Sequence, residues 1–234
     1  MALRSKLLDL LCPRTCPMCG VHSEGICSRC LMALPRTEQA SIRQNSTEYV
    51  VAGEEKDFVR RMRVMHLDKA AAFLHYEKDH PIQRVVHKMK YADQPLIGYQ
   101  LGQQAAIEFQ YAGFFEGIDV LVPIPLHEQR MRERGYNQSE YIAKGLSEIT
   151  GIPIDTTHVT RIRNTPQQAL QTGDERHHNV ANAFAVNHPE QLYGQHILVV
   201  DDLITTGETM RSCLKAMKKI RGATFSVFAL CKAR

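Results

Sequence analysis

Residues 196–209, HILVVDDLITTGET, constrain the fold of this chain more than any other segment. The four consecutive aliphatic residues 197–200 form a short, mostly β-branched run, which predicts a strand buried on both faces and therefore a parallel sheet. Asp201 and Asp202 follow where that strand is expected to end, and a loop of small residues, 205–207, comes next. The segment therefore predicts a buried strand that carries two carboxylates and a small-residue loop to one edge of a sheet.

An amphipathic helix is expected after this loop, because apolar residues recur on one helical face between Met210 and Ile220. A loop between a strand end and a helix N-terminus presents backbone N–H groups and a partial positive charge, which together bind phosphate. Gly207 lets the backbone approach closely, and threonine hydroxyls add donors. The carboxylates can accept hydrogen bonds from vicinal sugar hydroxyls, so the expected ligand is a ribose 5-phosphate group. The residues expected to bind it are Asp201, Asp202, Thr205, Thr206, Gly207, Glu208 and Thr209.

Residues 197–209 resemble the phosphoribosyl-pyrophosphate (PRPP) loop of the type I phosphoribosyltransferases, since the hydrophobic run, the acid pair and Thr-Thr-Gly occur in that order. The resemblance implies that PRPP binds together with Mg²⁺, which is held mainly by oxygens of the ligand itself. The alternative interpretation is an ordinary buried strand and turn with an incidental acid pair. The residues point to binding and assign no catalytic group.

A second candidate segment is basic and follows another expected strand. Residues 119–125, DVLVPIP, predict a strand that ends in prolines, so a loop should follow. Residues 130–138 contain three arginines, a glycine and two amides, which suits an anion because arginine pairs bidentately with phosphate oxygens. In the phosphoribosyltransferase frame this is the pyrophosphate loop; a solvated basic turn is the alternative. Its candidate residues are Arg132, Arg134, Gly135, Asn137 and Gln138, and Lys90, at the end of a helix expected from Pro81, is a further candidate ligand contact.

Paired cysteines near the start predict a metal site. Cys16 and Cys19 form one C-x2-C pair, Cys27 and Cys30 form another, and seven residues separate the pairs. Two such turns complete a tetrahedral sulfur cage for zinc, and four thiolates with no open position indicate a structural metal. A disulfide framework does not suit a cytosolic chain with five cysteines in this region. Two other residues could substitute as ligands, namely Cys12 and His22.

The remaining pattern predicts strands alternating with helices, hence a doubly wound α/β fold with a mostly parallel sheet of the type I phosphoribosyltransferase kind. Expected strands are 70–76, 119–125, 158–163, 197–200 and 225–231, and expected helices are 81–89, 95–111 and 138–150. We expect a zinc-ribbon-like module over 1–35, a linker with a candidate helix over 36–66, and the phosphoribosyltransferase-like domain over 67–234. The polar segment 164–188 is expected to be a flexible hood beside the site.

Composition favours a soluble globular protein, with 44% hydrophobic and 23% charged residues. No apolar run approaches the roughly 18–20 residues needed to span a bilayer. Lys6 and Asp9 interrupt the apolar start, and Leu11 is too large for a signal cleavage site, so a cytoplasmic location is expected. After Glu208 there is no acid, while seven Lys or Arg residues follow, which gives a basic C-terminal segment or simply a solvated helix face.

Taken together, these segments resemble the ComF family of competence and DNA-utilisation proteins over nearly the whole length. The segments that carry the resemblance are Cys16–Gly20, Val122–Leu126, Arg134–Gln138, Thr160–Gln168, Arg176 with Asn179 and Phe184, and the PRPP loop. The family implies an N-terminal zinc ribbon, a phosphoribosyltransferase-like domain, and a role with incoming single-stranded DNA in the cytosol. Many relatives carry a second set of paired cysteines, and residues 31–66 here have none, which argues against a second zinc unit.

Two function classes follow from the resemblance. The first is an accessory protein for DNA uptake, transformation or DNA utilisation that binds PRPP or a related ligand, single-stranded DNA and other cytosolic DNA-processing proteins. The second is an active enzyme that transfers phosphoribose to an amine or a base. We favour the first, because fold alone does not establish activity. The expected DNA-binding surfaces are a zinc module with Arg14, Arg29 and Arg36, the segment with Arg60, Arg61 and Arg63, and the basic C-terminal helix.

Overall fold

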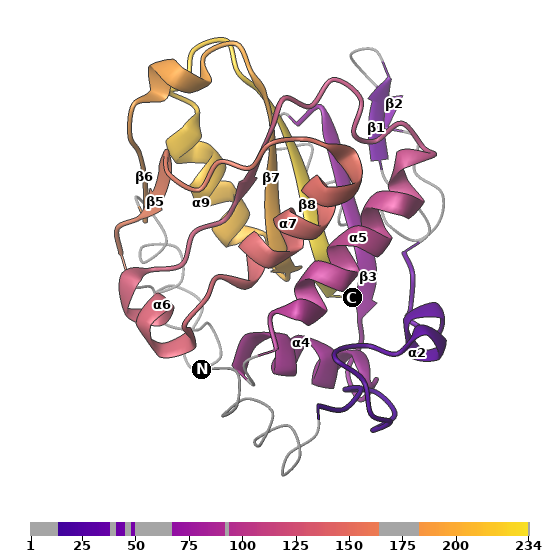
Figure 1. Cartoon of the computed structure of the whole chain (residues 1–234). Coiled ribbons are helices and arrows are strands. Elements are labelled where there is room, and N and C mark those ends of the chain that lie inside the picture. The colour runs from indigo at the N-terminus through magenta and orange to yellow at the C-terminus, as the bar shows by residue number, and fades with distance from the viewer. Residues whose placement is uncertain are drawn as a thin grey trace.

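A six-stranded sheet in the order β2-β1-β3-β8-β7-β4 forms the centre of the protein (Figure 1). The computed structural model describes residues 14–37, 41–44, 48–49, 67–91, 94–163 and 183–233. Four strands are parallel: β3 (Lys69–Tyr76), β8 (Thr224–Ala233), β7 (His196–Ile204) and β4 (Val120–Pro123). At one edge, β1 (Ser41–Gln44) pairs antiparallel with β3, and β2 (Glu48–Tyr49) pairs antiparallel with β1.

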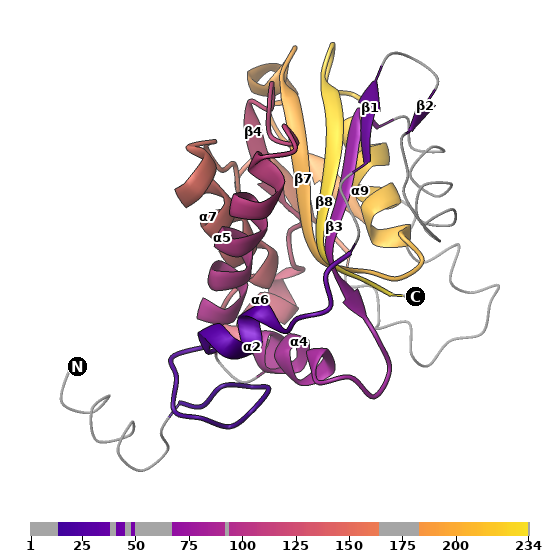
Figure 2. The ribbon, with the colours of Figure 1, turned by 90° about the vertical axis from the view of Figure 1, so that its right-hand side faces the viewer.

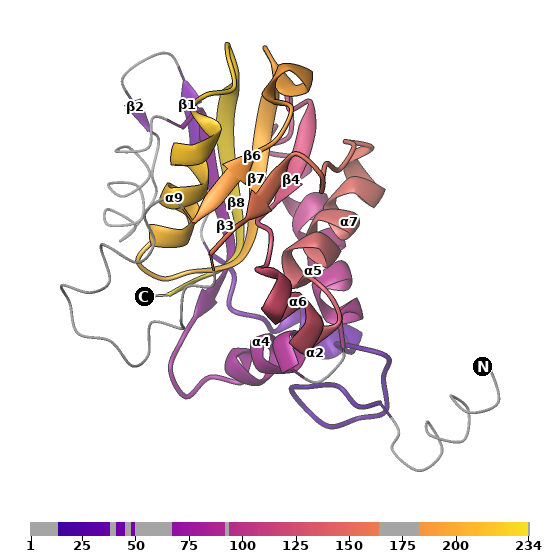
Figure 3. The ribbon, with the colours of Figure 1, turned by 90° about the vertical axis from the view of Figure 1, so that its left-hand side faces the viewer.

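Helices cover both faces of this sheet, so the doubly wound α/β fold predicted from the sequence is confirmed. One face carries α5 (Leu96–Gln110) and α7 (Gln138–Thr150), and the other carries α9 (Glu208–Met217) (Figure 2). Helix α4 (Ile82–Tyr91) lies beneath the sheet in the same view and shares the core of α5 and α7. Outside the main sheet, β5 (Val159–Arg161) pairs antiparallel with β6 (Phe184–Val186), and this pair packs beside α9 (Figure 3). Short helices complete the described part: α2 (Ser28–Met32), α6 (Glu128–Arg134) and the 3-10 turn η2 (Pro189–Leu192).

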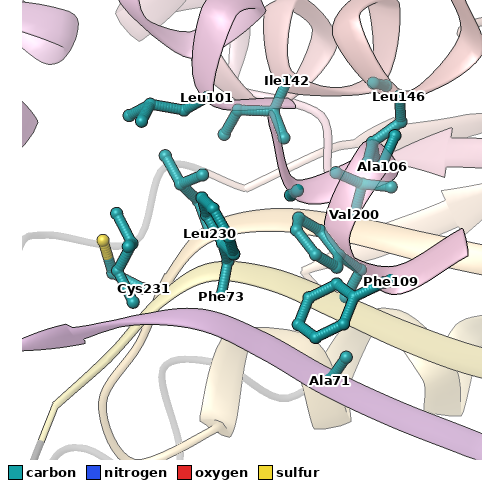
Figure 4. Packing of buried hydrophobic residues seen from close by; sticks show 14 of the residues in the cluster. Ala71, Phe73, Leu101, Ala106, Phe109, Ile142, Leu146, Val200, Leu230 and Cys231 are labelled. Atoms are coloured by element: carbon teal, nitrogen blue, oxygen red, sulfur yellow. The ribbon is translucent and has the colours of Figure 1, made fainter. Parts of the chain in front are cut away.

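The aliphatic run at the start of β7 is buried on both faces, as its sequence predicts. All four residues 197–200 have no exposed surface. Leu198 and Val200 face the core beneath α5 and α7, while Ile197 and Val199 face the core beneath α9. On the α5 side, Phe109 meets Phe73 and Phe228 edge-on, with ring centroids 6.0 and 6.1 Å apart (Figure 4). The strand β7 is therefore packed between two hydrophobic cores, one on each face of the sheet, and this packing fixes the position of the residues at its end.

Glycines allow α5 and α7 to pack backbone against backbone. A Cβ atom on Gly145 would lie 2.1 Å from the carbonyl oxygen of Tyr99, and one on Gly102 would lie 2.3 Å from the carbonyl oxygen of Ile142. Neither oxygen belongs to a flexible side chain that could move away. The close approach fixes the start of α7, which borders the end of β7.

The structure corrects two local expectations near the site. Asp201 and Asp202 do not follow the strand but lie within it, because β7 continues to pair with β8 as far as Ile204 opposite Lys232. Residues 130–134 are not loop but the last part of α6, since His127 caps that helix by accepting a hydrogen bond from the Gln129 N–H. Only the segment from Gly135 onward has the loop conformation that the sequence predicted for the whole basic stretch.

Some residues near the proposed domain borders form regular structure. The first part of the expected linker, 36–66, pairs with the main sheet: the Thr37 N–H donates to the Phe73 carbonyl, and residues 41–44 form β1. The end of the expected hood, 184–186, is the strand β6, whose Phe184 and Val186 pack in the core beneath α9. The candidate helix at 57–63 and hood residues 164–182 lie outside the described residues. Among the described helices, none combines the length and apolar character required to cross a bilayer.

Candidate functional site

Asp201 and Asp202 lie side by side near the end of β7, and both side chains are buried, with 8% and 4% of their surface exposed. Asp201 Oδ1 accepts hydrogen bonds from the Asp202 N–H at 2.8 Å and from the Ser139 hydroxyl at 3.4 Å. Burial and, second, the neighbouring charge of Asp202 raise the pKa of Asp201 to about 7. Asp201 therefore keeps its proton at pH values where an ordinary aspartate is ionised.

Lys90, from the end of α4, pairs with this acid pair. Its Nζ lies 3.0 Å from Asp202 Oδ2, and both side chains are largely buried. Burial of the Lys90 ammonium ion lowers its pKa, but attraction to the Asp202 carboxylate is the larger effect in sum. The pKa of Lys90 is therefore raised above its ordinary value. Lys90, a candidate ligand contact from the sequence, thus lies in direct contact with one of the two predicted diol acceptors.

The loop after β7 leads directly into α9. Thr205 and Thr206 are exposed, and Gly207 adopts a left-handed conformation with φ of +77°, so that α9 begins at Glu208. Gly207 offers no side chain to cap the helix, and Glu208 N–H makes a long contact of 3.4 Å with the Thr206 hydroxyl. Such a helix start can bind an anion through its N–H groups. Glu208 itself pairs with Arg211, and Thr209 is half-buried in the first turn.

The predicted pyrophosphate residues divide into two groups. Arg134 faces the end of α4, where its guanidinium lies 4.9 Å from the centre of the Tyr91 ring and donates to the Tyr91 hydroxyl at 3.3 Å. Arg132 lies on the exposed side of α6, where it pairs with Glu128. Gly135 ends α6 in a left-handed conformation with φ of +78°. The structure therefore brings Arg134 toward the Lys90 side of the site and leaves Arg132 in solvent.

The two amides of this segment hold the backbone. Asn137 caps α7: its Oδ1 accepts from the Ser139 N–H, and its Nδ2 donates to the Ile124 carbonyl at 3.0 Å. Gln138 is buried and accepts from Arg134 at 2.9 Å. Both side chains thus position the start of α7 and the guanidinium of Arg134, and Ser139 in turn reaches Asp201.

Sequence reasoning about the site did not single out Arg161, Ser139 and Tyr91, and it included Arg130 only as one of the three arginines of the basic segment. Arg161 lies on β5, where its guanidinium is 5.4 Å from the Phe184 ring centre. Burial and, second, the charge of Arg130 lower the pKa of Arg161, while Asp201 opposes them. The charges that act on Arg161 thus include those of Arg130 and Arg134 of α6 and of Asp201. The family motif around residues 160–168 was the feature of the sequence that could have indicated Arg161. Its position in space follows only from the pairing of β5 with β6.

The four predicted cysteines form one cluster. The sulfur atoms of Cys16, Cys19, Cys27 and Cys30 all lie within 4.8 Å of one another, and those of Cys19 and Cys27 are 3.7 Å apart. A tetrahedral zinc site with Zn–S bonds of about 2.3 Å needs sulfurs roughly 3.8 Å apart, so this donor set fits zinc. Gly20, with φ of +77°, closes the first knuckle. His22 is exposed, and Cys12 lies outside the described residues.

Comparisons with known proteins agree with this geometry. A family model described as a phosphoribosyl transferase domain matches residues 134–234, which include α7, the acid pair and the loop before α9. The DNA utilization protein YhgH of Salmonella typhimurium (strain LT2) is 31% identical over 155 residues, which are 65% of this chain and 67% of that protein. The chain belongs to the ComF/YhgH family of DNA-utilisation and competence proteins.

Other members of the ComF/YhgH family extend the match. The DNA utilization protein YhgH of Escherichia coli (strain K12) is 27% identical over 223 residues, covering 93% of this chain and 83% of that protein. Competence protein F of Haemophilus influenzae is 29% identical over 171 residues, covering 71% of this chain and 73% of that protein. Among solved structures, the allosteric regulatory enzyme of purine biosynthesis aligns with a TM-score of 0.38 and 16% identity, over 61% of this chain and 30% of that chain.

Proposed function

We propose that this ComF/YhgH protein is a cytoplasmic accessory protein for DNA uptake, transformation or DNA utilisation. In this role it binds PRPP or a related phosphorylated ligand, with Mg²⁺, at the end of β7. The observation that carries the proposal is the buried acid pair placed one short loop before the start of α9. That arrangement offers carboxylate acceptors and backbone N–H donors to the two ends of a sugar phosphate.

The existing contacts suggest how a ligand would bind. The 5-phosphate would take the N–H groups and hydroxyls of residues 205–209, and the sugar hydroxyls would reach Asp202. Ligand binding would then replace the Lys90–Asp202 ion pair, since Lys90 gains a phosphate oxygen as Asp202 gains a hydroxyl. Arg134 and Arg161 supply further positive charge for the pyrophosphate group, and Mg²⁺ neutralises the remainder of the ligand's charge.

Calorimetric titration of PRPP with Mg²⁺ into the full chain tests this site. A charge-assisted hydrogen bond contributes ~1.5–3 kcal/mol, so Asp202→Asn should weaken binding by about tenfold to a hundredfold. Asp201→Asn should cost less, because Asp201 is deeply buried and already bonded to the Asp202 N–H and Ser139. The exposed Asp119 is a matched control, and Asp119→Asn should bind like wild type. Equal affinity of wild type and Asp202→Asn would reject the site.

We further propose that the four cysteines hold one structural zinc ion per chain. The support is the donor set itself: four thiols whose sulfur atoms all lie within 4.8 Å of one another, close to the roughly 3.8 Å separation of a tetrahedral zinc site. The four protein ligands would leave no open position, so the metal would shape the module and take no part in chemistry. Metal analysis of the purified protein should give one zinc per chain, and a zinc-free folded protein would contradict the assignment.

Single-stranded DNA is the proposed macromolecular partner. The described surface that supports it is the outer side of α9 and the turn after it, with Lys215, Lys218, Lys219 and Arg221 exposed. Arg36 is a weaker candidate than expected, because it is engaged by Glu108 and lies over the Phe73 ring. Arg60, Arg61 and Arg63 lie outside the described residues.

Fluorescence anisotropy with a labelled oligonucleotide at several salt concentrations tests this partner. Phosphate contacts predict dissociation constants of roughly 10⁻⁴–10⁻⁶ M, with log K falling by about 0.7 per contact for each tenfold rise in salt. Charge reversal at Lys215, Lys218 and Lys219 should weaken binding and reduce this slope. Binding that is absent at low salt, or indifferent to salt, would remove DNA from the proposal.

An active phosphoribosyltransferase is the second candidate function, favoured by the family model over residues 134–234. Such an enzyme would transfer phosphoribose from PRPP to an amine or a base and release pyrophosphate. Incubating the protein with PRPP, Mg²⁺ and a panel of amines and bases, while following pyrophosphate, separates the two candidates. Release that depends on an acceptor and disappears in Asp202→Asn would favour the enzyme; binding without release would favour the accessory role.

A further inference from the structure

Helix α4 contacts two separate parts of the protein. Its first half contacts residues 14–37, which we call the cysteine module, and its end contacts the candidate ligand site. The Arg84 guanidinium donates to the carbonyl oxygen of Met18 at 3.2 Å, in the knuckle between Cys16 and Cys19. Six residues later, about 9 Å along the helix, Lys90 pairs with Asp202. Figure 2 shows α4 beneath the sheet with the cysteine module next to it.

The end of α4 is held at the site by three consecutive residues. The Met89 carbonyl accepts a hydrogen bond from the Tyr136 hydroxyl, Lys90 pairs with Asp202, and the Tyr91 hydroxyl accepts from Arg134. These partners come from the basic segment and from β7, the two parts of the site. A small shift of α4 would therefore disturb several of the contacts that arrange the ligand site at once.

The cysteine module supports α4 from the other side. Cys16, Ile26, Cys30 and Leu34 are buried in the same apolar core as Val85, Val86 and Met89 of α4. The Ile26 N–H also donates to Gln100 Oε1 of α5 at 3.0 Å. Besides the five residues of α2, the module has only single bridges, Thr15 with His22 and Arg36 with Leu74, so a metal cross-link would add strongly to what fixes its shape.

We propose that the cysteine cluster and the ligand site are coupled through α4, so that metal on the four thiols raises the affinity of the site for its phosphorylated ligand. Metal fixes the cysteine module, the module holds α4, and α4 holds Lys90 and Tyr91 in place. On the ligand side this inference rests on the function proposed above. Because coupling between two sites is reciprocal, bound PRPP should also slow the release of zinc to a chelator.

Hydrogen exchange measured by mass spectrometry tests the coupling without any ligand. Zinc-loaded full chain is compared with the same protein after treatment with a chelator. Exchange should rise in residues 14–37 and also in α4 and in the loop 205–209, while β5 and β6, which pack in the other core, keep their protection. A rise confined to residues 14–37 would overturn the coupling, and so would an equal rise everywhere, since that would be unfolding of the whole chain.

A variant that keeps the zinc provides the second test. Arg84→Ala removes the bond to Met18 without touching a cysteine, and should lower PRPP affinity about fivefold or more at unchanged zinc content. Arg84→Lys retains a donor and should restore part of the affinity. Lys88→Ala removes the same charge from the same helix and should have little effect. Equal losses in Arg84→Ala and Lys88→Ala would overturn the inference.

The two proposals fail in distinguishable ways. If zinc-loaded wild type does not bind PRPP, the proposed ligand is wrong, and hydrogen exchange alone decides the coupling. If wild type binds PRPP but its affinity is unchanged in Arg84→Ala and zinc release is indifferent to PRPP, the ligand site stands and the coupling is wrong.

Discussion

Replacing Asp201 by asparagine should make the free energy of unfolding less dependent on pH. In the folded protein, burial and then the Asp202 charge raise the pKa of Asp201 from 3.8 to about 7. Between these two values the folded chain holds a proton that the unfolded chain has released. The stability that this carboxyl contributes is therefore fully present below pH 3.8 and is lost as pH rises toward 7.

The expected magnitude follows from one proton. Each proton held only by the folded state changes the free energy of unfolding by about 1.4 kcal/mol per pH unit. From pH 4.5 to 6.5 the wild-type protein should thus lose up to about 2–3 kcal/mol through this group alone. Asparagine has the same shape and carries no titrating proton. Its Oδ1 can still accept from the Asp202 N–H and the Ser139 hydroxyl, so the packing of the site should be retained.

Urea titrations at half-unit pH intervals measure the free energy of unfolding of wild type and variant. Subtracting the two values at each pH removes the contribution of the titratable groups that both proteins share. The difference curve for Asp201→Asn should change by about 1.4 kcal/mol per pH unit across the window. The control Asp119→Asn removes an exposed carboxylate at the start of β4 and β7, the end of the strands opposite to Asp201. It should change the free energy of unfolding without reproducing the pH dependence of about 1.4 kcal/mol per unit. Parallel curves for wild type and Asp201→Asn would refute a buried, protonated Asp201.

Three further substitutions test the frame around the site. Gly145→Ala places a Cβ 2.1 Å from the Tyr99 carbonyl oxygen and should lower the urea-derived free energy of unfolding by about 1–3 kcal/mol; an unchanged midpoint would contradict the close helix packing. Arg36→Ala loses a partly exposed pair with Glu108, and a double-mutant cycle with Glu108→Ala should give a coupling of about 0.2–1 kcal/mol rather than zero. Cys19→Ser should reduce bound zinc below one per chain, and full retention would indicate that Cys12 or His22 replaces it.

The features predicted correctly from the sequence are those coded by neighbouring residues. The aliphatic run 197–200 specifies a doubly buried strand on its own, and the spacing of the cysteine pairs specifies a cluster without knowledge of the rest of the fold. The helix expected at 138–150 has the predicted bounds because Asn137 caps its start and Gly151, with φ of +74°, ends it. The helix that carries Lys90 was expected for the same reason, since it is strongly amphipathic, whereas the contact of Lys90 with a ligand stays a prediction.

The features missed depend on partners distant in the chain. Asp201 and Asp202 lie inside β7 because β8 is long enough to pair with them, and nothing near the acid pair signals the length of β8. Arg161 lies opposite Phe184 because β5 pairs with β6, across a polar segment that sequence patterns could only describe as a hood. The cysteine module shares the main core because Ile26 and Leu34 are buried in the same cluster as residues of α4 and α5. The residues next to Ile26 and Leu34 in the sequence do not indicate this long-range packing.

A crystal structure of the zinc-loaded protein with ribose 5-phosphate and Mg²⁺ is the most direct test of the central claim. The 5-phosphate should lie on the N–H groups of residues 205–209 at the start of α9, the sugar hydroxyls should lie on Asp202, and Lys90 should have moved from Asp202 to the ligand. A sugar phosphate bound elsewhere, for example on the basic outer side of α9, with the Lys90–Asp202 pair intact, would contradict it.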